Sequence, residues 1–193
     1  MENMRSLRKI NKGLIATIIV VCILTIYLVS VEMDRKQQKG KIESVCKEYL
    51  HAYDTIMAIP EQEREDLDKY VEKAKNTIKP YLLDKKEVVD LQMKWLTDSL
   101  KQEKENEQFI KTQTNELTKI SKYQFDNDQV RVILETKLTK EVENSQGEVH
   151  HNTSNSLNDE IILKKEGDTW KVVYASLSSV ATIFPETVMY KSF

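Results

Sequence analysis

The sequence contains few of the residues that cross-link, bend or punctuate a chain. Among its 193 residues only two are cysteines, Cys22 and Cys46, which is too few for a disulfide framework or a four-thiolate zinc site. Four glycines and three prolines make up about 4% of the chain, against about 12% on average, which disfavours collagen-like and linker-dominated proteins. The scattered glycines cannot form a dinucleotide-binding or phosphate-binding loop. We therefore expect much helix and no nucleotide cofactor.

One long apolar segment lies near the N-terminus. From Leu14 to Val31 no residue is charged, and in a helix this run reaches about 27 Å, enough to span a bilayer. Basic residues precede it while Glu32 and Asp34 follow it, which favours a cytoplasmic N-terminus. A cleaved signal peptide is the rival interpretation, but the run is long for one and residues 28–31 lack a small-residue cleavage pair. We predict a transmembrane helix over residues 14–31 after a cytoplasmic tail, residues 1–13.

Basic residues beyond the span weaken the charge argument for its orientation. Arg35, Lys36, Lys39 and Lys41 bring the basic residues on the two sides close to parity. A domain of about 160 residues behind a single N-terminal span nevertheless usually translocates regardless of nearby charges. We therefore expect a single-pass cell-membrane protein with its N-terminus in the cytoplasm. In that arrangement residues 32–41 are a polar connector and residues 42–193 form the extracytoplasmic domain.

The part of the chain beyond the span is acidic. The first 31 residues hold four of the 29 basic and one of the 31 acidic residues, so the remainder carries a formal charge near −5. Nucleic-acid recognition generally needs a basic stripe with stacking aromatic residues, whereas Lys and Glu are interspersed here. We therefore expect no direct nucleic-acid binding.

Three apolar stripes at helical spacing open the domain. They predict helices over residues 42–57, 60–80 and 84–104, the second beginning at a proline that suits a first helical position. At the start of the third, Asp84 and Glu87 have the spacing of a capping box. The first half of the domain is therefore predicted to be helical.

Further along, apolar residues recur with the period of a strand. The segments 117–125, 130–142, 161–163 and 170–174 fit four strands, separated by turn-forming residues. Strands joined by short turns must be antiparallel, and the helices come before them as a block. The polar run 150–159 fits either a strand or a loop. The predicted fold is α+β, with about three helices packed on a curved antiparallel sheet of about four strands.

Residues that could carry chemistry have no partners at useful spacing. His150 and His151 are adjacent, so on a strand they point to opposite faces, and neither has metal-ligand spacing to another His or Cys. Cys46 lies on an apolar helix stripe, which predicts a core position rather than a catalytic thiol. The charged runs 61–69 and 101–107 look like solvated helix faces. We therefore predict no catalytic, cofactor-binding or metal-binding residues.

Two groups of aromatic residues could contact a ligand or a partner. A sheet curled around helices can enclose a pocket, which Tyr49, Tyr53, Tyr70 and Trp95 are placed to line, with Asp54 as a candidate floor. The competing interpretation is a packed core, since aromatic residues on helix stripes are commonly just buried. The apolar C-terminal segment, residues 178–193, contains two candidate interface anchors, namely Phe184 and Tyr190.

The closing strand pair, residues 160–164 and 167–173, follows three helices and a long meander, and this order resembles the nuclear-transport-factor-two-like α+β cone. With the basic tail and single span, the chain resembles the VirB-eight-like membrane proteins of type IV secretion, particularly the conjugation components of Gram-positive bacteria. That resemblance implies a non-enzymatic scaffold, which self-associates and contacts other channel subunits. Two alternatives remain: an envelope ligand-binding or toxin-immunity protein that uses the pocket or the sheet face, and an isomerase-type or dehydratase-type enzyme with an acid or base inside the cone.

Overall fold

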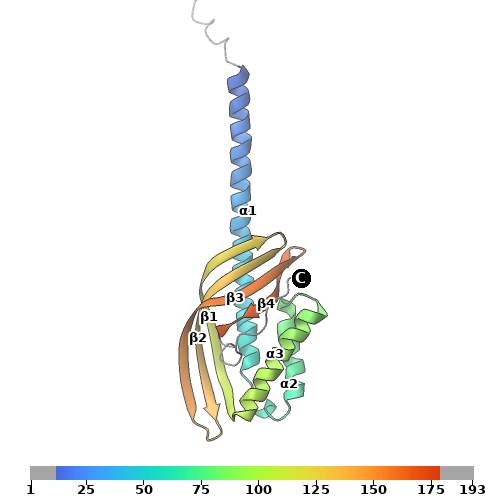
Figure 1. Cartoon of the computed structure of the whole chain (residues 1–193), viewed down its shortest axis with the longest axis vertical. Helices are drawn as coiled ribbons and strands as arrows, with labels where there is room; N and C mark the ends of the chain where they lie inside the picture. Colours follow the sequence, from blue (N-terminus) through green and yellow to red (C-terminus); the bar gives the residue numbers. More distant parts are fainter. Residues whose placement is uncertain (1–11, 179–193) are drawn as a thin grey trace, which may run out of the picture. The chain divides into compact units, whose positions relative to one another are not determined.

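The computed structural model describes residues 12–178 and confirms the α+β class (Figure 1). The helices are α1 (Lys12–Met57), α2 (Leu67–Ile78) and α3 (Lys86–Glu105), with one-turn 3-10 helices at Glu61–Glu63 and Lys79–Tyr81. The strands are β1 (Gln108–Asp126), β2 (Gln129–Asn144), β3 (Val149–Glu166) and β4 (Thr169–Ser176). The chain divides into two compact units, split between Lys41 and Ile42.

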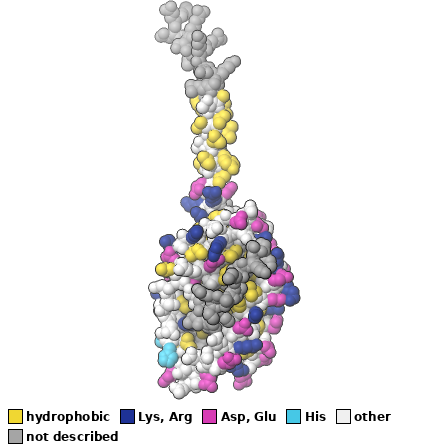
Figure 2. All heavy atoms as spheres, viewed as in Figure 1, with side chains coloured by type: hydrophobic (Ala, Val, Ile, Leu, Met, Phe, Trp, Pro, Cys, Tyr) yellow, Lys and Arg dark blue, Asp and Glu magenta, His cyan; other side chains and the backbone are white. Residues whose placement is uncertain are grey.

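The first unit is the N-terminal part of α1, where apolar side chains face outward all round. From Ile18 to Val29 the large apolar side chains are between 53% and 69% exposed, and Figure 2 shows them along this part of the helix. Within residues 12–178, α1 is the one helix long and apolar enough to cross a membrane. A helix that is apolar on all sides and covered by no protein is typical of a membrane anchor.

The segment that we predicted as a polar connector, residues 32–41, is helical and belongs to α1. Its residues are mostly Lys, Arg, Glu and Gln, which are good helix formers, and it contains no proline. These residues therefore continue the helix, although their polar composition led us to predict a connector.

In the second unit, the last turns of α1 supply one side of the core. Ile42, Cys46, Tyr49 and Tyr53 recur at helical spacing and are all buried. They belong to one cluster that also holds buried residues of α2, α3 and the sheet. The helices therefore cover one face of the sheet, as the sequence predicted.

The second predicted helix begins later than expected. Pro60 precedes a one-turn 3-10 helix, and α2 starts only at Leu67. Asp66 caps α2, because its carboxylate accepts a hydrogen bond from the backbone N–H of Lys69 at 3.1 Å. The proline signal therefore marked a short turn, and the true N-cap is an aspartate that the sequence analysis did not use.

The capping box predicted at the start of the third helix is wrong. The N-cap of α3 is Lys85, and no side chain caps it. Asp84 lies one residue too early and instead approaches the ammonium group of Lys79 at 3.8 Å. The spacing of Asp84 and Glu87 therefore did not identify the N-cap residue.

The sheet is an antiparallel meander in the order β1-β2-β3-β4. β1 begins at Gln108, well before the predicted residue 117, and β3 includes the whole run 150–159, which is therefore a strand. The turns fall where predicted, with positive φ at Asn127, Gly147 and Gly167. Positive φ favours Gly and Asn, which explains why these residues occupy the turns.

Three extra residues in β1 bend the sheet. Lys111, Thr118 and Ser121 each have no partner in the β1–β2 register, so each is a β-bulge. The Thr118 hydroxyl donates to the Glu135 carbonyl at 2.7 Å, and the Ser121 hydroxyl donates to the next strand in the same way. These side chains replace ladder hydrogen bonds at the bulges. Because bulges increase local twist, they account for the strongly curved sheet in Figure 1.

Strand β3 has two unlike parts. From Glu160 to Lys164 it pairs with both β2 and β4, whereas from Val149 to Ser156 it pairs with β2 alone. Between these parts the register with β2 shifts by one residue near Leu157. We call residues 149–157 the β3 edge segment.

Candidate functional site

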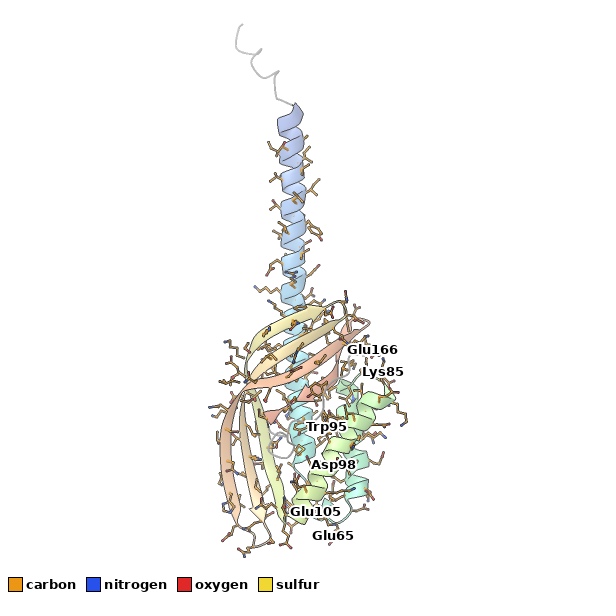
Figure 3. All side chains as sticks on the ribbon, in the orientation of Figure 1. Glu65, Lys85, Trp95, Asp98, Glu105 and Glu166 are labelled. Carbon is orange, nitrogen blue, oxygen red and sulfur yellow. The ribbon has the colours of Figure 1, made fainter. Side chains whose placement is uncertain are left out.

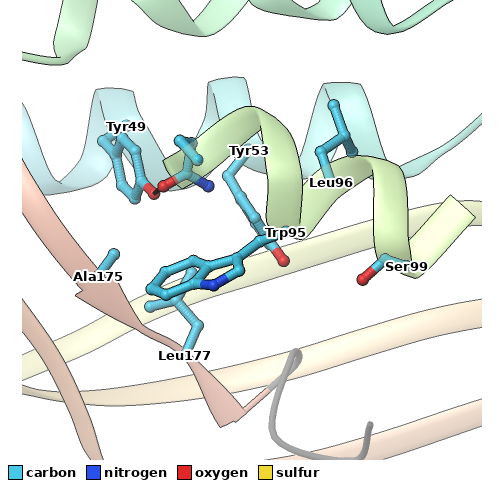
Figure 4. A pocket seen from close by; sticks show the side chains of 8 residues that line it. Tyr49, Tyr53, Trp95, Leu96, Ser99, Ala175 and Leu177 are labelled. Carbon is cyan, nitrogen blue, oxygen red and sulfur yellow. Dashed lines mark hydrogen bonds between the residues drawn. The ribbon is translucent and has the colours of Figure 1, made fainter. Parts of the chain in front are cut away.

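Three of the four residues predicted to line a pocket come together in the domain. Tyr49 and Tyr53 extend from α1 towards Trp95 on α3, next to the end of β4 (Figure 4). The remaining lining residues are Gln92, Leu96, Ser99, Ala175 and Leu177. The sequence therefore identified neighbours in space from the spacing of aromatic residues on two helices.

The cavity between these residues is almost completely filled. Its volume is about 10 Å³, room for about one water molecule, whereas ligand pockets usually measure about 300 Å³ or more. The rings of Tyr49 and Tyr53 stack with centroids 6.3 Å apart. Trp95 meets Tyr174 edge to face at 5.7 Å. These contacts are typical of a packed aromatic core.

Tyr49 is held as a neutral hydrogen-bond donor. Its hydroxyl donates to the Oε1 atom of Gln92 at 3.2 Å, and its side chain is fully buried. Burial raises the pKa of Tyr49 far above its usual value, because the phenolate would lose its hydration. A tyrosine in this state joins α1 to α3 and is poorly suited to proton transfer near neutral pH.

Tyr70, the fourth predicted lining residue, does not line this cavity. Its hydroxyl donates to the Ile56 carbonyl at 3.0 Å and so connects α2 to the end of α1. Burial, with smaller contributions from the charges of Glu63 and Glu103, raises the pKa of Tyr70 to about 12. Tyr70 thus satisfies a carbonyl at a helix end.

Asp54, the candidate floor of the pocket, is buried and turned towards β1. Its carboxylate accepts hydrogen bonds from the Gln113 side chain at 3.1 Å and from the Asn115 backbone N–H at 2.6 Å. The Asn115 amide group donates to the same carboxylate. Three donors satisfy this buried charge, so Asp54 joins α1 to the sheet.

A second buried carboxylate was missed by the sequence analysis. Glu103, at the end of α3, accepts a hydrogen bond from the Ile110 backbone N–H at 3.1 Å and is only 8% exposed. Burial raises the pKa of Glu103 to about 7, although that hydrogen bond and the charges of Lys140 and Arg64 oppose the shift. Glu103 therefore titrates near neutral pH.

Arg64 lies beside this group and links the α1–α2 connection to the sheet. Its guanidinium binds the Glu143 carboxylate at 2.9 Å and lies 4.5 Å from the centre of the Phe109 ring. We predicted that the charged runs 61–69 and 101–107 would be solvated faces. Arg64 and Glu103 correct that prediction, since each run contributes one largely buried member.

A third buried carboxylate lies where β3 changes neighbours. Asp159 is 1% exposed, and its Oδ1 atom accepts hydrogen bonds from the Ser156 hydroxyl at 2.7 Å and from the Ser178 backbone N–H at 2.7 Å. Its Oδ2 atom accepts one from the Thr136 hydroxyl. These bonds fix the bulge in β3 and the end of β4. A polar sequence around position 159 gave no signal for a buried charge.

The described His, Cys, Asp and Glu side chains form no metal site, and the buried cysteine is unreactive. Within residues 12–178, no group of three His, Cys, Asp or Glu side chains could hold a metal ion. His150 and His151 are exposed, whereas Cys46 is buried as predicted. Burial also raises the pKa of the Cys46 thiol to about 12, which leaves it unreactive at neutral pH.

The outer surface of α3 is polar. Asp98 and Glu105 lie along this helix in Figure 3, and around its C-terminal turns polar side chains line an open depression of about 370 Å³. The predicted interface anchors Phe184 and Tyr190 fall outside the described residues.

Comparisons with known proteins give a distant structural likeness. No protein-family model matches the chain, and no curated protein matches its sequence. Among solved structures, the intermembrane space region of chloroplast protein ARC6 is similar to this chain, with a TM-score of 0.40 and 12% identity. The match covers 70% of this chain and 92% of that one. A likeness of this degree supports no statement about function, and the resemblance to VirB-eight-like proteins stays a prediction.

Proposed function

We propose that this protein is a membrane-anchored, non-enzymatic assembly factor that acts through protein contacts of the domain formed by residues 42–193. Two features support the proposal. Residues 14–31 lie in α1, whose large apolar side chains from Ile18 to Val29 are exposed, which suits a lipid environment. The cavity that would have to hold a ligand or substrate has a volume of about 10 Å³.

The filled cavity is the observation that carries the proposal. A catalytic acid or base must reach its substrate within hydrogen-bond distance. Asp54 and Asp159 are instead buried and engaged by protein donors, and Tyr49 donates to a neighbouring helix. These polar groups hold the elements of the fold together. The same small volume gives no support to the alternative of ligand binding inside the cone.

The more specific proposal is a role in a type IV secretion channel for conjugative DNA transfer. Its support is the order of a basic tail, one span and an α+β domain, which resembles the VirB-eight-like proteins. In this proposal the N-terminus is cytoplasmic and the domain lies outside the membrane. There it contacts other channel subunits and further copies of itself, without contacting DNA.

Crosslinking in the native membrane tests this proposal. The tagged full-length chain is treated with a cleavable lysine-reactive crosslinker, purified and analysed by mass spectrometry. A tagged anchor comprising residues 1–41 is the matched control, because it shares the membrane segment and lacks the domain. We expect the full chain, and not the anchor, to recover a transfer ATPase or other channel subunits. Recovery of a single secreted toxin would instead support an immunity protein, and identical recovery by both chains would contradict a role for the domain.

A further inference from the structure

Two edges of the sheet carry features that prevent further strand pairing. An exposed edge strand offers unpaired backbone groups to other chains, and proteins commonly block it with lysines, bulges or a covering segment. β1 contains three bulges and also three lysines, at positions 111, 119 and 122. β4 is covered near Val172, whose carbonyl accepts a hydrogen bond from the Leu83 backbone N–H at 2.9 Å. β1 and β4 are therefore protected against pairing with a strand of another chain.

The β3 edge segment has no lysine, and its one register shift lies at its end, near Leu157. At that end the hydroxyls of Ser156 and Ser178 lie 2.7 Å apart, so the part without a described neighbour on its outer side runs from Val149 to Asn155. Residues 149–157 contain no Lys, Arg, Asp, Glu or Pro, and the register with β2 is regular from Val149 to Ser156. Among residues 12–178, no strand pairs with the outer side of this segment. The side chains of Val149 to Asn155 are all exposed. Within residues 12–178, Val149 to Asn155 thus form a regular edge without Lys, Arg, Asp or Glu that no described strand covers.

We propose that the β3 edge segment pairs antiparallel with the same segment of a second copy of this chain, with Thr153 opposite Thr153. This register centres the two-fold axis on the middle residue of the uncharged run. Asn152 then lies opposite Ser154, and His151 lies opposite Asn155. Small polar residues face polar residues, and no like charges oppose one another at neutral pH. The two four-stranded sheets become one continuous sheet.

The ends of the segment favour a second copy over an unrelated partner. In this register each Val149 lies opposite a Leu157 of the other copy, so an apolar pair closes each end. Val149 and Leu157 are 37% and 66% exposed and are two of the four large apolar side chains exposed in residues 42–178. The segment is therefore complementary to itself at its ends as well as its centre. An isologous contact of this kind generates a closed dimer.

Membrane anchoring adds to this preference. Each copy carries the apolar part of α1, so copies in one bilayer share a thin layer rather than the full solution volume. Confinement raises the effective concentration of one edge segment for another. A main-chain contact that is weak in solution then suffices for pairing.

Site-specific disulfide formation tests the register. The full-length chain is prepared with Cys22→Ala, while Cys46 stays because it is buried. In the proposed pairing the Cα atoms of the two Thr153 residues lie about 5 Å apart, within disulfide range. Thr153→Cys should therefore form a covalent dimer on mild oxidation in membranes. Asn155→Cys is the matched control, because the two copies of residue 155 lie about 14 Å apart along the strands.

A mixed experiment completes the disulfide test. Chains with His151→Cys and chains with Asn155→Cys should each form no covalent dimer alone and should crosslink when they are co-expressed. Equal crosslinking of Thr153→Cys and Asn155→Cys, or crosslinking of neither, would overturn the proposed pairing.

Introducing a charge at position 153 distinguishes a loss of strand pairing from a loss of folding. Thr153→Lys and Thr153→Glu each place like charges opposite one another across the two-fold axis, and should weaken dimerisation by about tenfold. A mixture of the two variants should restore it. Unchanged dimerisation of Thr153→Lys, or no rescue in the mixture, would contradict the proposal. The dimerisation result is independent of the secretion role. A scaffold that does not dimerise would still recover channel subunits in the crosslinking experiment.

Discussion

The two parts of strand β3 differ in almost every physical respect. Ile161 and Leu163 are completely buried against the helices, and this part of the strand has a neighbour on each side. The β3 edge segment pairs with β2 alone, and its side chains from Val149 to Asn155 are exposed. One strand therefore supplies packing energy at one end and an open backbone edge at the other. Core packing and the proposed partner contact are thus separated along a single strand.

Removing equal side chains from the two parts should have the most unequal effect. Leu163→Ala should lower the free energy of unfolding by about 2–5 kcal/mol, because it leaves a cavity in the core. Leu157→Ala, six residues away and 66% exposed, should change it by less than about 0.5 kcal/mol. Guanidinium unfolding of the full chain in detergent, followed by tryptophan fluorescence, measures both. Similar losses for the two variants would contradict the division.

Titration of Glu103 should make the helix-covered part of the domain sensitive to pH. The folded pKa of Glu103, about 7, exceeds the ordinary glutamate pKa of about 4.5, so between these pH values the folded state holds a proton that the unfolded state releases. This stabilisation is complete below pH 4.5 and is lost as pH rises through 7, with a total of about 3 kcal/mol.

Glu103→Gln should abolish that pH dependence and raise stability at pH 8, since the amide oxygen still accepts the hydrogen bond from Ile110. Glu105→Gln, at an exposed position on the same helix, is the control. Unfolding free energies measured from pH 4.5 to 8 test the prediction. A Glu103→Gln variant with the pH profile of the natural chain would refute it.

The junction between the two parts of β3 depends on Asp159. Asp159→Ala removes a carboxylate that accepts hydrogen bonds from Thr136, Ser156 and Ser178, and should lower stability by about 2 kcal/mol. Asn158→Ala, at the exposed neighbouring position, should leave stability nearly unchanged. The same unfolding assay compares them, and equal midpoints for the two variants would show that the buried network does not hold the junction.

The bulges of β1 should contribute the smallest effect. Thr118→Val removes the hydroxyl that donates to the Glu135 carbonyl at 2.7 Å and should cost about 1 kcal/mol. Thr139→Val, at an exposed position in the regular part of β2, is the matched control. If the control lost as much stability as Thr118→Val, the bulge hydrogen bond would not be the cause.

Hydrophobic periodicity predicted the class and order of the fold, because the core is made by stripes and alternating positions that recur regularly. It failed at boundaries that depend on other forces. α2 begins at an aspartate cap rather than at Pro60. The first part of β1 was missed because a bulge at Lys111 interrupts its alternation. The strand 150–159 shows no alternation, since both of its faces are largely exposed.

The candidate site was predicted in part. Tyr49, Tyr53 and Trp95 meet because they lie on the inward faces of two helices that pack together. Tyr70 lies on another helix, whose packing direction the sequence did not reveal. Glu103 and Arg64 were missed because a buried charge within a charged run has the same sequence pattern as its solvated neighbours. Such groups become recognisable only when tertiary contacts are known.

Hydrogen exchange measures directly whether β3 is divided between a core part and a self-pairing edge. The natural chain and Thr153→Lys are compared in membranes by mass spectrometry. We predict that the amides of residues 149–157 exchange faster in Thr153→Lys, while those of residues 160–166 are protected equally in both. Equal exchange of residues 149–157 in the two chains would contradict the claim.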